Sequence, residues 1–85
     1  MDYKRQISAA EAYTVGARLG LDWAQVDPEQ FRHGLEVELD HSGRGRATTV
    51  TYDSLILMGK IAWTHLKETR DYYIQLDWLA ARAER

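Results

Sequence analysis

The sequence predicts a single all-α domain, a compact bundle of about four helices. Two observations lead to this prediction: apolar residues recur at three- and four-residue spacing along most of the chain, and helix start and stop signals divide it into four segments. The 85 residues leave no room for a second domain. We expect residues 1–7 to form a flexible N-terminus and residues 42–52 to form a loop.

The first predicted helix begins after Ser8, which opens a capping box. Ser8 can accept a hydrogen bond from the backbone N–H of Glu11, and Glu11 can reach back to the N–H of Ser8. Apolar residues continue at helical spacing to Leu19, and Gly20 follows where a left-handed C-terminal residue is favoured. Because Gly16 costs about 1 kcal/mol relative to Ala in mid-helix, we expect another backbone to approach closely there.

The second predicted helix begins at Asp27 and Pro28. Asp is a favoured N-cap, and Pro suits the first helical position because its backbone angle is already helical. The helix should stop near residues 42–43, where Ser is followed by Gly. Its apolar stripe is formed by Phe31, Leu35 and Leu39.

Two further helices complete the predicted bundle. The third starts at Asp53 or Ser54 and runs to about Lys67; because it is apolar almost all round, it is either central or presents a second face to a partner. The fourth starts near Asp71 and continues to the C-terminus. We expect its core-facing stripe to contain Tyr72, Tyr73, Leu76, Leu79, Ala80 and Ala83.

The composition excludes several classes of function. The chain has no Cys, so it forms no disulfide and no thiolate metal site. No membrane-length apolar run and no secretory signal are present, which predicts a cytoplasmic protein. Glycine-rich phosphate motifs and nucleophile motifs are also missing, so we expect no enzyme activity and no cofactor. The two arginines within residues 43–46 are thin support for nucleic-acid binding in an acidic protein, so we expect no direct contact with nucleic acid.

Acidic residues are concentrated in one segment. The formal net charge of the chain is −2, but residues 22–43 carry six acids against Arg32 alone, a net of −5. This segment is either a face for a basic partner or a solvated helix surface.

Two titratable side chains fall on predicted core faces. Glu38 lies on the buried stripe of the second helix and His65 on that of the third, so we expect a hydrogen bond between them. His41 and Glu68 lie three residues further along the same faces and extend the pair to a buried polar network. The same four residues could instead bind Zn²⁺, Fe²⁺ or Mn²⁺, although only two helices would supply ligands.

Two tryptophans lie off the core stripes of their helices. Trp63 points away from the stripe that contains His65, and Trp78 lines up with Ile74 and Arg82. These rings either pack against the first helix or are exposed anchors, because Trp contributes strongly to interface energies.

From Phe31 onward the chain resembles an uncharacterised small domain family of bacteria and phages. The family pattern reads Phe-x-x-Gly-Leu-x-Val-Glu-x-Glu-His, then Gly-Lys-Ile-Ala-x-x-His-Leu-x-Glu-x-x-Asp-Tyr-Tyr-x-x-Leu. The upstream segment Arg18-Leu19-Gly20-Leu21-Asp22-Trp23 also fits, so the resemblance covers about residues 15–76. It implies a phage or prophage setting in a bacterial host cell and assigns no activity. It also implies that the polar residues belong to a shared framework: Glu38, His41, His65 and Glu68. Trp63 stands where the family has a small apolar residue, which suggests a partner surface particular to this chain.

Together these features predict a non-enzymatic, phage- or mobile-element-associated protein that binds a protein partner with a basic surface. We expect an inhibitor of a host defence or nucleic-acid-handling complex, in the manner of an anti-CRISPR protein. The expected partner-binding residues are Asp27, Glu29, Glu36, Asp40, Trp63 and Trp78. The alternatives are a small metal-binding domain that uses the Glu/His cluster and a homodimeric structural accessory protein.

Overall fold

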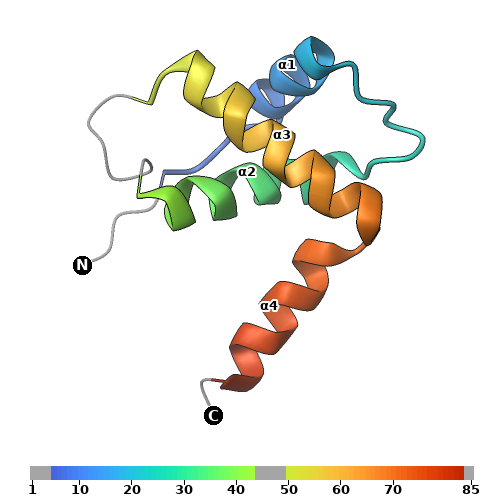
Figure 1. Cartoon of the computed structure of the whole chain (residues 1–85), viewed down its shortest axis with the longest axis vertical. Helices are drawn as coiled ribbons and strands as arrows, with labels where there is room; N and C mark the ends of the chain where they lie inside the picture. Colours follow the sequence, from blue (N-terminus) through green and yellow to red (C-terminus); the bar gives the residue numbers. More distant parts are fainter. Residues whose placement is uncertain (1–4, 44–49, 84–85) are drawn as a thin grey trace.

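A computed structural model describes residues 5–43 and 50–83 of the chain. Within these ranges it contains four helices and no strand: α1 (Ala9–Leu19), α2 (Pro28–Ser42), α3 (Tyr52–Glu68) and α4 (Tyr72–Ala83) (Figure 1). The predicted all-α, four-helix fold is therefore confirmed. Residues 1–4 of the predicted N-terminal segment and residues 44–49 of the predicted loop lie outside the described residues.

The helices begin where their caps predict. Ser8 Oγ accepts from the Glu11 N–H at 3.1 Å while Glu11 Oε1 accepts from the Ser8 N–H at 3.0 Å. Asp27 Oδ1 accepts from the backbone N–H of Glu29 at 2.8 Å. Helix α3 begins earlier than predicted because Thr51 is its N-cap. The Thr51 hydroxyl accepts from the backbone N–H of residue 54 at 3.1 Å.

The core lies among α1, α2 and α3, and α4 leaves this body. Figure 1 shows α4 continuing from the end of α3 and pointing away from the other three helices. It contacts α2 through its first turns. Tyr73 is its one fully buried side chain in the described structure. The buried apolar residues of the first three helices are Ala12, Val15, Phe31, Leu35, Leu39, Leu55, Met58, Ala62 and Leu66.

Gly16 gives space to an aromatic ring. A Cβ atom at Gly16 would overlap with the Trp23 indole. That ring packs edge-on against Tyr13 and Phe31, with centroids 5.0 and 5.7 Å away. The expected close approach of a backbone at Gly16 is therefore wrong: a side chain from the α1–α2 connection fills the space.

The N-terminal segment is attached to α2 at residue 7. Ile7 is buried; its N–H donates to Glu36 Oε2 at 2.8 Å and its carbonyl accepts from Arg32 Nη1 at 2.9 Å. The expectation of a flexible segment up to residue 7 is therefore wrong for Ile7, because two α2 side chains bind its backbone, and helical spacing alone does not reveal such contacts.

Candidate protein-binding surface

A buried polar contact joins α4 to α2. The Tyr73 hydroxyl donates to Glu38 Oε2 at 2.9 Å, and the two residues are 0% and 9% exposed. Burial, together with the hydrogen bond to the Glu38 carboxylate, raises the pKa of Tyr73 far above its usual value, so the hydroxyl remains a donor. Gly34 on α2 makes room for the ring, because a Cβ atom there would overlap with it.

This contact replaces the predicted hydrogen bond between Glu38 and His65. His65 Nε2 lies 3.8 Å from Glu38 Oε2, which is too long for a hydrogen bond. The His65 ring instead stacks on Tyr72 with a centroid distance of 4.2 Å. Sequence reasoning missed Tyr73 as the partner of Glu38. The available signal was a tyrosine on a core stripe, because a buried hydroxyl needs an acceptor.

The predicted four-residue polar network does not form. His41 and Glu68 are both exposed, so the expectation that they extend a buried cluster is wrong. Within residues 5–43 and 50–83, no three His, Asp or Glu side chains lie close enough together to hold a metal ion. The arrangement of these four residues therefore gives the metal-binding alternative no geometric support.

The acidic residues of α2 mostly contact their own chain. Glu36 Oε2 accepts from Arg32 Nη1 at 2.8 Å as well as from the Ile7 N–H, and Glu29 accepts from Arg32 Nε at 2.8 Å and Nη2 at 2.7 Å. These bonds, led by the one to Glu29, raise the pKa of the Arg32 guanidinium above its usual range. Arg32 thus offsets two of the acids that were expected to face a basic partner.

The other two acids also have partners. The Asp27 carboxylate caps α2, where it accepts from backbone N–H groups. Asp40 is half-buried and has a polar partner of its own. The geometry therefore does not present Asp27, Glu29, Glu36 and Asp40 as a row of uncompensated charges.

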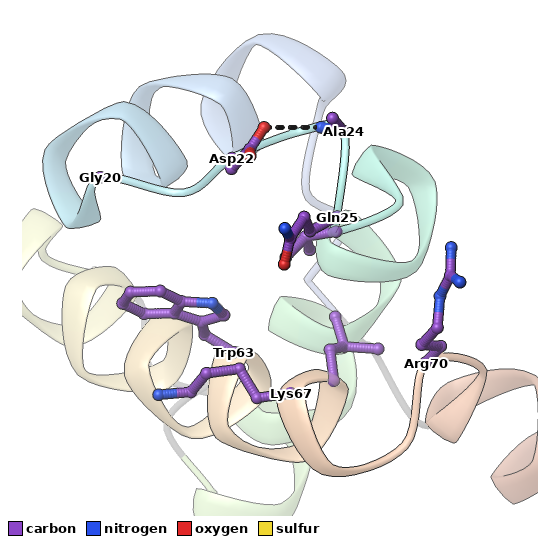
Figure 2. A pocket seen from close by; sticks show the side chains of 9 residues that line it. Gly20, Asp22, Ala24, Gln25, Trp63, Lys67 and Arg70 are labelled. Atoms are coloured by element: carbon purple, nitrogen blue, oxygen red, sulfur yellow. Dashed lines mark hydrogen bonds between the residues drawn. The ribbon is translucent and has the colours of Figure 1, made fainter.

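Trp63 borders a cavity of about 550 Å³ between the α1–α2 connection and the end of α3 (Figure 2). The ring is half-buried against the core, and the Lys67 ammonium lies 4.5 Å from its centroid. Lys67 and Arg70 lie at or just beyond the carbonyl end of α3, where the helix dipole favours cations. Trp63 therefore contributes to packing as well as to the surface. The helix dipole explains why the cationic residues Lys67 and Arg70 lie at this end of α3.

Trp78 lies on an exposed apolar surface of α4. Ile74, Trp78 and Leu79 are 59%, 57% and 57% exposed. We call this surface the outer face of α4. The prediction that Leu79, Ala80 and Ala83 continue the core stripe is wrong. All side chains from residue 77 to residue 83 are exposed, because α4 points away from the three-helix body (Figure 1).

Polar contacts tie the first half of α4 to α2. Besides the Tyr73 bond, Gln30 Nε2 donates to the Arg70 carbonyl at 2.7 Å, immediately before the helix. His33 Nε2 lies 2.8 Å from Asp77 Oδ2, a close polar contact outside hydrogen-bond geometry. These contacts fix the direction in which the outer face points.

None of the described helices is long and apolar enough to cross a membrane.

Comparisons with known proteins identify the family of the chain but assign it no function. No curated protein and no solved structure matches the chain. One family model, described as a protein of unknown function (DUF5661), matches residues 12–82. That match confirms the resemblance to an uncharacterised small domain family, and the chain belongs to the DUF5661 family.

Proposed function

We propose that this protein works without catalysis, as a module that binds another protein chain on the outer face of α4. One observation carries the proposal: three large apolar side chains of a single short helix, Ile74, Trp78 and Leu79, are each more than half exposed. An apolar helix that a small domain leaves uncovered is typical of an interaction surface.

The energetics favour occupation of this face. Complete burial of a large apolar side chain stabilises a complex by about 1.5–3 kcal/mol. Covering the exposed half of each of these three side chains therefore stabilises the complex by about half of that value for each side chain. Trp and Arg are the residue types that most often dominate interfaces. Both residue types are present on this face: the Arg82 guanidinium lies 4.6 Å from the centroid of the Trp78 ring.

The chemistry of the expected partner differs from the sequence-based expectation. Since the α2 acids have partners within the chain, a strongly basic partner surface gains little from them. An apolar groove or helix suits the outer face better. That the partner belongs to a host defence or nucleic-acid-handling complex stays a prediction, as does a cytoplasmic location.

Site-specific photo-crosslinking in the native host cell tests the proposal. A photoreactive side chain replaces exposed Gln75, which lies beside Trp78 and Leu79 at three- and four-residue helical spacing. The change removes the hydrogen bond from Gln75 to Asp71 and leaves the three apolar side chains intact. Matched probes replace Leu57, an exposed leucine on α3, and Glu29 on α2. We expect a covalent protein adduct from position 75 alone, and its loss when Trp78→Ala is added.

The opposite pattern would overturn the proposal. Adducts from positions 29 or 57, with none from position 75, would assign binding to the acidic face of α2 or to α3. Adducts from position 75 that survive Trp78→Ala would show that the apolar side chains do not carry the binding.

A further inference from the structure

Two opposite charges border the outer face of α4. Asp71 precedes the first turn of the helix, where its Oδ1 accepts from Gln75 Nε2 at 2.8 Å and its side chain remains exposed, and Arg82 lies in the last turn. Arg82 follows Asp71 by eleven positions, which is three helical turns plus about 20°, so the two residues share one face about 16 Å apart along the axis. Ile74 and Trp78 lie between them on this face, and Leu79 lies at its edge. The order along the face is acid, apolar residues, base.

This order is self-complementary when it is read in opposite directions. A two-fold axis midway between residues 76 and 77 sets Asp71 opposite Arg82 of a second copy. The same axis sets Ile74 opposite Leu79 of the second copy, and the reverse of both pairs follows by symmetry. We propose that the partner of the outer face is a second copy of this chain, with the two α4 helices packed antiparallel; this inference rests on the proposed function.

Other partners and orientations pair the two charges of the outer face less favourably. A parallel pair would set Asp71 against Asp71 and Arg82 against Arg82, and would align the two helix dipoles unfavourably. A strongly acidic or strongly basic partner would match only one of the two charges. The outer face therefore specifies both a partner and an orientation.

The shape of the molecule permits this pairing. Because α4 points away from the three-helix body, antiparallel pairing leaves the two bodies at opposite ends of the helix pair (Figure 1). The inner side of α4 is already occupied by the Tyr73–Glu38 and Asp77–His33 contacts with α2. The outer face thus remains available over the length of the helix.

The expected dimer is weak. Helix α4 has 12 residues, about 18 Å of length, and one such helix pair is small beside a standard interface of about 1,600 Å². We therefore expect a reversible dimer with a dissociation constant on the order of tens of micromolar.

Sedimentation equilibrium of the full chain measures this association directly. We expect the apparent mass to rise from 9.8 kDa towards twice that value as concentration increases from about 1 µM to about 1 mM. Leu79→Glu should keep the chain monomeric throughout. Leu57→Glu, which makes the same change at a 43% exposed leucine of α3, should dimerise like the wild type.

Charge reversal tests the antiparallel register. Asp71→Arg alone sets two arginines opposite each other at both ends of the pair, and Arg82→Asp alone sets two aspartates opposite each other. Each variant should dimerise about tenfold more weakly at low salt. A mixture of the two variants restores both opposite-charge pairs and should recover the dimer. Far-ultraviolet circular dichroism confirms that each variant is folded.

The outcomes separate this inference from the proposed function. A folded chain that stays monomeric over the whole concentration range overturns the second copy as partner. A position-75 adduct with a different protein would then still support the proposed binding function. A dimer that survives Leu79→Glu, or charge variants that do not recover on mixing, overturns the antiparallel α4 interface.

Discussion

At the scale of single residues, the contact between Tyr73 and Glu38 has the largest consequence for the binding surface. It joins α4 to α2 at the core, where Tyr73 is fully buried and Glu38 is 9% exposed. A buried carboxylate is costly unless donors satisfy it, and the Tyr73 hydroxyl supplies such a donor. Removing that donor should therefore weaken the attachment of α4.

Tyr73→Phe tests this role. At neutral pH we expect the free energy of unfolding to fall by about 1–3 kcal/mol, because Glu38 loses its donor while it stays buried. Urea denaturation measures the change. Tyr72→Phe is the matched control: it keeps the stacking on His65 and removes a half-buried hydroxyl, so it should change stability by less than about 0.5 kcal/mol.

The same variant has an expected pH dependence. The folded pKa of Tyr73 is raised above the ordinary value of 10.0, so its contribution is fully present below pH 10 and is lost as pH rises beyond it. The stability difference between wild type and Tyr73→Phe should shrink above pH 10, by up to about 1.4 kcal/mol per pH unit. A difference that stays constant from pH 9 to about pH 11 would contradict the assigned role.

At the scale of elements, local signals predicted where helices begin and end. The caps at Ser8 and Asp27 fixed α1 and α2, and α3 and α4 begin within two residues of their predicted starts. The direction of α4 could not be predicted from the sequence. Periodicity identifies an apolar face, but it does not reveal whether a neighbour lies opposite that face. Leu79 was therefore assigned to a core that ends one turn earlier, at Leu76.

The candidate site was predicted only in part for the same reason. The alignment of Trp78 with Ile74 and Arg82 was visible in the sequence, because it follows from helical spacing alone. The partner of Glu38 was not, because His65 and Tyr73 both lie on core stripes and the helix packing decides which one reaches the carboxylate. Charge counting also missed that Arg32 on the same helix binds Glu29 and Glu36.

Gly34→Ala tests how closely α4 packs against α2. An alanine methyl group would overlap with the Tyr73 ring. We expect a net loss of about 1–3 kcal/mol on chemical denaturation, although Ala favours helix over Gly by about 1 kcal/mol. In a Tyr73→Leu background the ring is absent, so Gly34→Ala should be neutral or stabilising. Equal losses in both backgrounds would show that the ring is not the cause.

At the scale of the whole molecule, a small three-helix body carries a fourth helix that it covers on one side only. Most of the charge in the acidic segment is used for caps and internal ion pairs, so the surface left for a partner is the apolar outer face of α4. The chain belongs to the DUF5661 family, whose model matches residues 12–82 and so includes almost all of α4. The central claim is that this face is covered when the protein is at work.

Hydroxyl-radical footprinting of the tryptophans tests that claim most directly. In dilute purified protein, Trp78 should be oxidised faster than half-buried Trp63, which serves as the internal reference. Inside the cells that produce the protein, we expect the oxidation of Trp78 relative to Trp63 to fall several-fold, because a bound chain shields the outer face. An unchanged ratio between dilute protein and cells would contradict the account.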